Sequence, residues 1–270
     1  MSEVSAGSAD DLQVKERMAE QNDSASNPRA LIVIPAYNEA GKIKQVIADL
    51  RAHVGEMAIA VIDDGSMDAT ADLAERAGAI VLRLPFNLGI GGALQTGYLY
   101  AAKHGYDAAV QFDGDGQHRA DQVRDLIAPV LAGRADMAIG SRLLGKGDYR
   151  FPLMRRMGSK LIGLITRLVT GRWISDPTSG FRAHGRRALA FFARNYPQAY
   201  LDSAEITVWV LRQGMRVEEV PVEMRSAEHS SIGSLRGVLH SMRACLALLI
   251  DRIEKRFPEA PEPEDPAKEG

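Results

Sequence analysis

The chain has almost no cysteine, with one residue, Cys245, among 270. A single thiol excludes an intramolecular disulfide and is typical of a protein from a reducing compartment. Because Cys245 lies inside the apolar stretch 244–248, a buried core thiol is favoured over a catalytic nucleophile. Any chemistry is therefore expected from other side chains.

Long hydrophobic runs and a charge excess of one sign are also missing. No segment is long and apolar enough to span a bilayer, since the best candidate, residues 238–250, is interrupted by His240 and Arg243. No basic region followed by an apolar run marks a secretory signal. A net charge of −2 argues against a general nucleic-acid binder. We expect a cytoplasmic protein, either free or peripheral at the cytoplasmic face of the membrane.

Composition divides the chain into one domain and its flanks. Residues 1–28 are polar and 258–270 are rich in Pro and Glu, which predicts a mobile N-terminal tail and an acidic disordered C-terminal tail. Residues 29–233 are predicted to form a single domain. Residues 234–257 predict an amphipathic helix with basic flanks, which lies either on an anionic membrane surface or against the core.

Strand and helix patterns alternate along the first half of the chain. Residues 30–35 form a continuous apolar run, typical of a strand covered on both faces. Further strands are predicted at 58–62, 79–84, 108–112, 136–139 and 217–222. Helices are predicted at 43–50, 68–77, 91–103, 121–131, 153–170, 185–194 and 204–212. This order predicts an α/β fold with a mainly parallel, helix-covered sheet.

Polar clusters follow three of these strands. They are Pro35-Ala36-Tyr37-Asn38-Glu39, Asp63-Asp64-Gly65-Ser66 and Asp113-Gly114-Asp115-Gly116-Gln117-His118. Open parallel sheets bind ligands beyond the carboxyl ends of their strands, so the three clusters should meet at one edge. Asp113 and Asp115, with one small residue between them, can approach the same hard cation. Mg²⁺ and Mn²⁺ prefer such oxygen ligands.

The Gly-rich stretch 87–92 leaves two interpretations open. Its backbone amides can approach a phosphate at the start of a helix, or it can be a tight strand-to-helix turn. Leu94 stands where the dinucleotide-binding pattern Gly-x-Gly-x-x-Gly needs its last glycine, so dinucleotide binding is disfavoured.

Five motifs in order resemble the family-2 glycosyltransferases of the GT-A fold. Besides the three clusters, they are Gly140-Ser141-Arg142 and Asp176-Pro177-Thr178-Ser179-Gly180-Phe181-Arg182. The resemblance covers about residues 30–232. It is closest to the polyprenyl-phosphate hexose synthase branch, to which the dolichol-phosphate mannose synthases belong. It implies a nucleotide-binding sheet of GT-A type.

The resemblance implies a donor site at the strand ends. Pro35, Tyr37 and Glu39 would line the nucleotide of a nucleoside-diphosphate sugar. Asp63 would hydrogen-bond the base, and Gly114 would lie against the ribose.

The same resemblance implies a catalytic metal. Asp113 and Asp115 would hold Mg²⁺ or Mn²⁺, which would bridge the diphosphate. Gln117 would lie near the metal or the phosphates.

The resemblance also implies phosphate-binding arginines and one more acid. Arg142 and Arg155 would contact phosphate oxygens, either of the leaving diphosphate or of a phosphate acceptor, because guanidinium donors match phosphate geometry. Asp176 would lie on the acceptor side. Arg225 corresponds to an arginine of a loop that is shortened here, so its contact is carried over only weakly.

The implied reaction is the inverting transfer of a hexose to a polyprenyl phosphate. The implied partners include a lipid-phosphate acceptor, with peripheral membrane contact or a small membrane partner. A hydroxyl acceptor on a sugar or protein is an alternative, for which Asp202 or Glu205 would act as general base. Residues 112–116 also resemble the nucleophile loop of haloacid-dehalogenase-like phosphatases, although that loop follows the first strand there. A catalytically silent scaffold is a further alternative.

Overall fold

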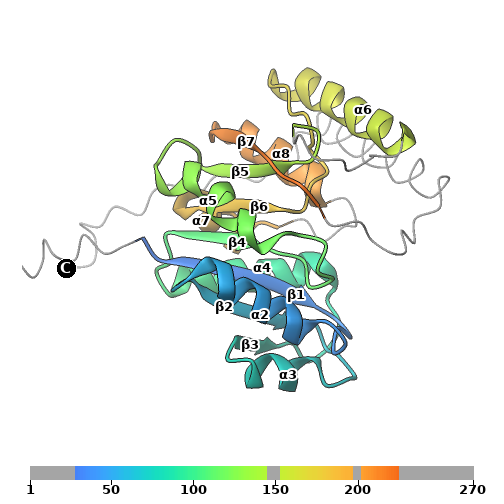
Figure 1. The fold of residues 1–270 in the computed structure, drawn as a ribbon. Coiled ribbons are helices and arrows are strands. Elements are labelled where there is room, and N and C mark those ends of the chain that lie inside the picture. Colours follow the sequence, from blue (N-terminus) through green and yellow to red (C-terminus); the bar gives the residue numbers. More distant parts are fainter. Residues whose placement is uncertain (1–27, 145–152, 197–201, 225–270) are drawn as a thin grey trace, which may run out of the picture.

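The domain is a single sheet covered by helices on both faces (Figure 1). The computed structural model describes residues 28–144, 153–196 and 202–224. The predicted tails, the helix predicted at 234–257, Cys245 and Arg225 lie outside the described residues.

Strands and helices alternate much as the sequence predicts. The strands are β1 (Ala30–Ala36), β2 (Ala58–Asp63), β3 (Ile80–Arg83), β4 (Ala108–Gln111), β5 (Met137–Ser141), β6 (Arg182–Gly185) and β7 (Val217–Pro221). The helices are α2 (Ile43–Val54), α3 (Thr70–Arg76), α4 (Gly89–Lys103), the 3₁₀ turn η1 (Ala120–Gln122), α5 (Val123–Leu131), α6 (Leu153–Thr170), α7 (Arg186–Arg194) and α8 (Asp202–Arg212).

The seven strands run in the order β3-β2-β1-β4-β6-β5-β7. β1 pairs in parallel with β2 and β4, β2 with β3, and β5 with β7. β6 is antiparallel to both of its neighbours, β4 and β5. The mainly parallel, helix-covered sheet is therefore confirmed, and β6 is a strand that the sequence pattern did not predict.

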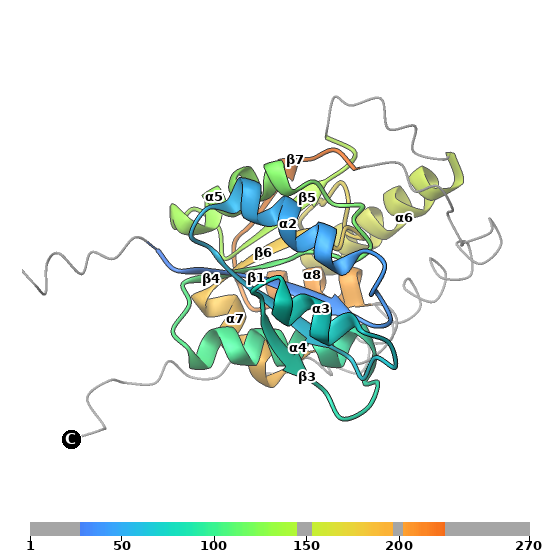
Figure 2. The ribbon, with the colours of Figure 1, turned by 60° about the horizontal axis from the view of Figure 1, so that its bottom comes forward.

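Two hydrophobic layers explain the continuous apolar run of β1. Ile32 and Ile34 face the layer that contains α2, α3 and α5, whereas Leu31 and Val33 face α4, α7 and α8. Figure 2 shows α2 and α5 on one side of the strands and α4 and α7 on the other. The contact with α4 is close, because a Cβ added at Gly97 would lie 2.3 Å from Val33 Cγ1. Both faces of β1 are therefore core, as the sequence indicates.

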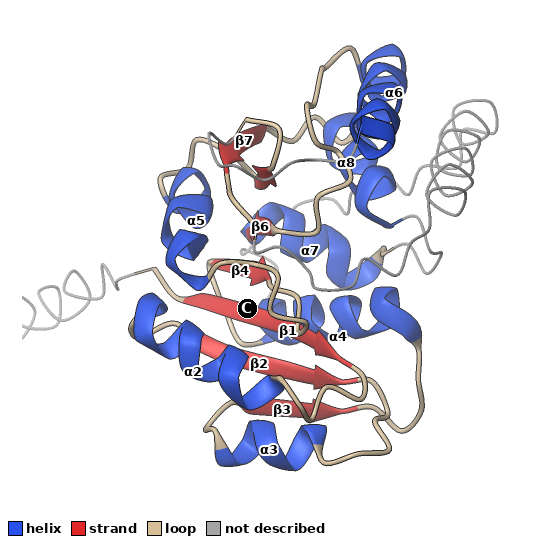
Figure 3. Ribbon diagram, turned by 45° about the vertical axis from the view of Figure 1, so that its right-hand side comes forward, coloured by secondary structure: helices blue, strands red, loops and turns tan. Residues whose placement is uncertain are grey.

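Helix α6 lies at the end of the sheet, apart from the two layers (Figure 3). Its buried apolar side chains Ile162 and Ile165 form a separate small cluster with Ala204 and Val208 of α8. Within the described parts of the chain, no helix combines the length and the hydropathy needed to cross a membrane.

Candidate functional site

Three polar loops meet at one edge of the sheet. β1 and β2 are in register there, with Ala36 opposite Asp63. The loop after β1 is joined to the loop after β2 by side chain–backbone bonds, in which the Asn38 N–H donates to Ser66 Oγ (2.9 Å) and the Met67 N–H donates to Asn38 Oδ1 (2.9 Å). Asn38 has a φ of 56°, a left-handed conformation that asparagine tolerates. These bonds bring the predicted nucleotide-binding residues of both loops together.

The two acids at the end of β2 have different surroundings. Asp64 is buried and accepts the backbone N–H groups of Leu88 (2.7 Å) and Gly89 (2.9 Å). Its carboxylate thus satisfies amides at the start of α4, which supports the tight-turn interpretation of residues 87–92. Asp63 is also buried but accepts only a long bond, of 3.4 Å, from the Ser66 N–H among the described residues. Asp63 therefore has more hydrogen-bonding capacity left for a ligand than Asp64.

Asp113 lies two residues after β4, at the same edge. One of its oxygens, Oδ1, is buried and has no hydrogen-bond partner within the described residues. Its other oxygen, Oδ2, lies 3.3 Å from His118 Nε2. Gly180 lies against this carboxylate, since a Cβ added there would be 3.5 Å from Oδ2. A buried carboxylate oxygen without a donor is costly alone but suits a cation.

Asp115 lies two residues further along the same loop. Its carboxylate accepts the backbone N–H of Gln117 (2.9 Å) and the side-chain amide of Gln117. Burial raises the pKa of Glu39, and the nearby carboxylates of Asp115 and Asp68 add to this rise against a lowering by Lys42. Asp115 and Glu39 are thus close enough to repel each other, and a cation at Asp115 would reduce that repulsion.

Gly114, between the two acids, packs against the loop after β1. A Cβ added at Gly114 would lie 3.2 Å from the Pro35 carbonyl oxygen and 3.8 Å from Glu39 Cγ. The absence of a side chain therefore lets Asp113 and Asp115 approach the predicted nucleotide-binding loop. Over the described residues, no group of three or more His, Cys, Asp or Glu side chains is arranged to hold a metal. A divalent cation bound through two carboxylates would need further ligands from phosphate or water, as is common for Mg²⁺.

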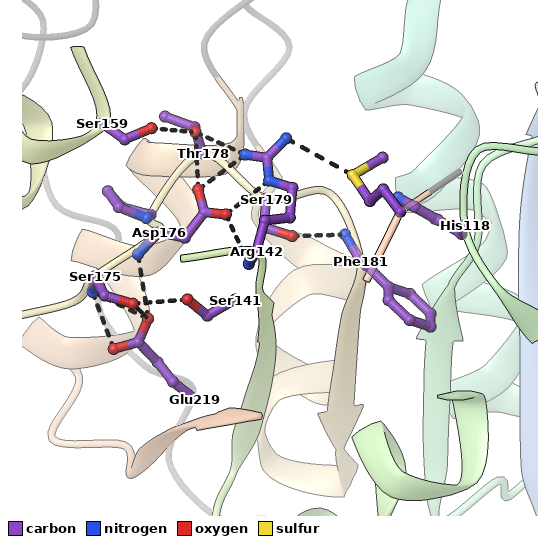
Figure 4. A network of polar contacts seen from close by, with 12 residues as sticks. His118, Ser141, Arg142, Ser159, Ser175, Asp176, Thr178, Ser179, Phe181 and Glu219 are labelled. Atoms are coloured by element: carbon purple, nitrogen blue, oxygen red, sulfur yellow. Dashed lines mark hydrogen bonds and ion pairs between the residues drawn. The ribbon is translucent and has the colours of Figure 1, made fainter. Parts of the chain in front are cut away.

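A second polar cluster joins the end of β5 to the loop before β6 (Figure 4). Arg142 Nε donates to Asp176 Oδ2 (2.7 Å), and Arg142 Nη2 donates to Asp176 Oδ1 (2.8 Å). Asp176 is fully buried, and the Arg142 side chain is 12% exposed. The Thr178 hydroxyl accepts a bond from Arg142 Nη2 (3.1 Å) and contacts Ser159 Oγ of α6 (3.3 Å). The predicted acceptor loop is therefore fixed to both β5 and α6.

Burial and the arginine act on Asp176 in opposite directions. Burial raises the pKa of Asp176, but the hydrogen bonds and the charge of Arg142 outweigh it, so the pKa lies below the ordinary value of 3.8. An acid held ionised by a bidentate arginine orients that arginine and anchors its own loop. The structure thus brings together Arg142 and Asp176, which were predicted separately.

Two residues that support this loop were not assigned a role from the sequence. Glu219 of β7 accepts bonds from the backbone N–H groups of Ser175 (2.9 Å) and Asp176 (3.1 Å). Arg182 is fully buried and donates to the carbonyl oxygens of Pro177 (2.8 Å) and Ser179 (2.7 Å) and to Thr207 of α8. The only sequence signal was the position of Arg182 at the end of a recognised motif.

The other predicted residues are at least partly exposed or not fully described. Tyr37 follows β1 and is 47% exposed at the rim. Arg155 lies in α6, and Asp202 begins α8, but only their backbone is described. Glu205 lies on α8, and Arg225 is outside the described residues. Their predicted contacts with substrate stay predictions.

The Arg142–Asp176 pair yields a test of stability. Asp176→Asn leaves the arginine buried without its counter-charge, so we expect the free energy of unfolding to fall by about 3–5 kcal/mol. Since the folded pKa is below 3.8, the contribution of Asp176 is complete above that value and is lost as the pH falls through the folded pKa. The difference between the variant and the wild type should therefore shrink in acid. Urea unfolding from about pH 7 down to about pH 3 measures it.

An exposed ion pair provides the matched control for this substitution. Asp72 pairs with Arg83 on the surface, and both side chains are about half exposed. Asp72→Asn should leave the free energy of unfolding nearly unchanged, because solvent screens such pairs. Equal losses from the two substitutions would contradict the structural role of Asp176.

Known proteins are similar to this chain in sequence or in fold. A family model described as "Glycosyl transferase family 2" matches residues 31–191. The undecaprenyl-phosphate mannosyltransferase of Micrococcus luteus is 32% identical over 77% of this chain and 90% of its own length. The UDP-N-acetylglucosamine–dolichyl-phosphate N-acetylglucosaminyltransferase of Methanococcus voltae is 30% identical over 74% of this chain and 86% of its own length.

A solved structure agrees with the predicted fold. Glucosyl-3-phosphoglycerate synthase from Mycobacterium tuberculosis, crystallised with Mn²⁺ and UDP-glucose, has a TM-score of 0.64 and 20% identity, covering 90% of this chain and 84% of that one. This likeness confirms the GT-A fold. The named relatives are enzymes, which sets aside the phosphatase and scaffold interpretations. Because the family model matches more than half of the chain, the protein belongs to the family-2 glycosyltransferases and is a glycosyltransferase enzyme.

Proposed function

We propose that this enzyme transfers a hexose, with inversion, from a nucleoside-diphosphate sugar to a polyprenyl phosphate. The observation that carries the proposal is the pair of acids at the sheet edge, Asp113 and Asp115, packed through Gly114 against the loop after β1. The Arg142–Asp176 cluster lies next to it, since Gly180 of the same loop touches Asp113. The proposed donor and acceptor sites would thus be adjacent.

On the donor side, the geometry suits a diphosphate held through a metal. Asp113 and Asp115 would hold Mg²⁺ or Mn²⁺, and Gln117 would orient Asp115 through its two bonds. The nucleoside would lie on the loops after β1 and β2, where it would meet Pro35, Tyr37, Glu39 and Asp63. The structurally similar M. tuberculosis enzyme was crystallised with Mn²⁺ and UDP-glucose, which supports a metal and a nucleotide sugar as ligands here.

The chemistry needs charge stabilisation more than a protein nucleophile. When bound, the metal would stabilise the negative charge that grows on the departing nucleoside diphosphate. An acceptor phosphate is already an anion, so it can attack the anomeric carbon without a general base. Attack opposite the leaving group inverts the configuration at that carbon.

Arginines would hold the acceptor phosphate. Arg142 is fixed by Asp176 before any substrate binds, so little ordering entropy remains to be lost on binding. We assign the same role to Arg155, whose helix contacts the acceptor loop through Ser159.

A lipid acceptor is supported by the outer face of α6. Met157, Leu161, Leu164 and Leu168 recur with the spacing of one helix face, and all four side chains are exposed. The helix contains arginines and a lysine but no acidic residue. An exposed apolar stripe with basic neighbours suits the surface of an anionic membrane. We propose that α6 lies on the cytoplasmic face of a membrane and brings the acceptor loop to the lipid headgroup.

The metal assignment can be tested by one nearly isosteric substitution. Asp115→Asn removes a charge from the cation site, so we expect sugar transfer to fall by about 100-fold or more while the fold is kept. Turnover with Mg²⁺ or Mn²⁺ and circular dichroism measure the two effects. Asp125→Asn, on the exposed side of α5, is the control and should keep its activity. Wild-type turnover by Asp115→Asn would refute the metal site.

The acceptor assignment can be tested by following a labelled sugar. With labelled nucleotide sugar, a polyprenyl phosphate should yield an organic-extractable sugar lipid, whereas a free polyprenol should be inert because it lacks the anionic nucleophile. Transfer of the label to a sugar or protein hydroxyl instead, abolished by Glu205→Gln or Asp202→Asn, would overturn the lipid acceptor but not the glycosyltransferase activity.

The role of α6 adds a second arm to the same assay. A double variant with Leu161→Gln and Leu164→Gln should transfer less sugar in anionic vesicles. Its sugar transfer to a short-chain acceptor in solution should be unchanged. Leu99→Gln, at an exposed position on α4, is the matched control. Equal activity of all three proteins in vesicles would exclude the membrane contact of α6.

A further inference from the structure

His118 and Asp113 are joined twice, through the backbone and through the side chain. The Asp113 N–H donates to His118 Nδ1 (3.2 Å), and His118 Nε2 lies 3.3 Å from Asp113 Oδ2. The His118 side chain is 2% exposed and that of Asp113 is 32% exposed, so the ring is shielded from solvent while the carboxylate stays open to the site. The polar contacts of the His118 ring are therefore with Asp113.

The backbone contact determines which ring nitrogen carries the proton. Because Nδ1 accepts the Asp113 N–H, Nε2 is the ring nitrogen that carries a proton. That nitrogen lies 3.3 Å from Asp113 Oδ2, and the contact between them is electrostatic. The backbone of the loop thus turns the protonated side of the ring to the same residue's carboxylate.

Aromatic packing holds the ring in this orientation. The imidazole stacks on Phe181, with the ring centroids 4.7 Å apart and an angle of 24° between the planes. It meets the edge of Phe112 at 5.5 Å and 83°. Rotation of the ring would lose both contacts as well as the bond to Asp113.

We propose that His118 is a positioning residue that fixes the Asp113 carboxylate for the divalent cation. The contact at Oδ2 restrains rotation of the carboxylate, and its remaining lone pairs are left for the metal. Polar groups that orient metal ligands in this way typically change metal affinity by about 10- to 100-fold when they are removed. The inference rests on the proposed function, because it requires that Asp113 binds the metal.

Three substitutions distinguish the contribution of each ring nitrogen from that of the aromatic stacking. His118→Phe keeps the stacking but removes both nitrogens. His118→Asn keeps an acceptor near the position of Nδ1, and His118→Gln keeps a donor near the position of Nε2. If the contact at Oδ2 matters, His118→Phe and His118→Asn should bind the metal more weakly than the wild type. His118→Gln should keep most of the wild-type affinity for the metal.

The measurement is the Mn²⁺ concentration that gives half-maximal binding of UDP or GDP to the full chain, by calorimetry. We expect this concentration to rise by about 10- to 100-fold for His118→Phe and His118→Asn, and far less for His118→Gln. Nucleotide binding in EDTA should be unchanged, whereas a general structural defect would lower it too. His104→Phe, at an exposed position after α4, should match the wild type.

Asp115→Asn separates the two ways in which the idea can fail. If Asp115→Asn removes the Mn²⁺ dependence and His118→Phe keeps the wild-type value, the role of His118 is wrong and the metal site stands. If Asp115→Asn also keeps the wild-type value, the proposed metal site itself is wrong. Loss of nucleotide binding in EDTA by all three His118 variants would make the histidine a structural residue.

Discussion

The site depends on the parallel register of β1 with its two neighbours. β1 lies between β2 and β4, and all three strands point the same way. Their carboxyl ends therefore reach the same edge, and the parallel pairing alone brings the polar loops that follow them together. Side chain–backbone bonds such as that from the Asn38 N–H to Ser66 Oγ then hold the loops in one arrangement. A strand of opposite direction at β2 or β4 would place these residues at opposite ends of the sheet.

The antiparallel strand β6 completes the site from the other half of the chain. Because β6 runs against β4, the loop that precedes β6 lies at the carboxyl end of β4, where Gly180 touches Asp113. The same loop carries Asp176, which is tied to Arg142 at the end of β5. One reversal of chain direction thus places the proposed acceptor loop against the acidic loop. Its buried polar groups are satisfied by Arg182 and Glu219.

Much of the fold could be predicted from periodicity, but β6 could not. The run in β1 and the acids after β4 are local features, so sequence alone indicated the sheet and placed Asp113 and Asp115 at its edge. β6 has Arg182 and His184 at buried positions, which is the opposite of a strand signal. Both are accommodated only by tertiary packing. Burial lowers the pKa of His184 to about 3, with a further contribution from Arg182, so that histidine is neutral in the core.

The site was predicted as a list of residues, and the structure adds their pairing. Asp63 and Asp64 are adjacent in sequence, and nothing in the local sequence indicates that Asp64 accepts the backbone N–H groups at the start of α4. The partner of Arg142 is 34 residues away, so its ion pair depends on how β5 and the loop before β6 pack. His118 belonged to a recognised motif, but its contact with Asp113 needs the ring orientation that Phe112 and Phe181 impose.

The central claim is that the acids after β4 bind a divalent cation together with a nucleoside diphosphate. Crystals grown with Mn²⁺ and UDP or GDP, measured at the manganese absorption edge, test it directly. The account predicts an anomalous peak within coordination distance of Asp113 and Asp115 and of oxygens from both phosphates, with the base near Asp63. A bound nucleotide whose manganese lies away from both acids, or a nucleotide bound elsewhere on the domain, would contradict it.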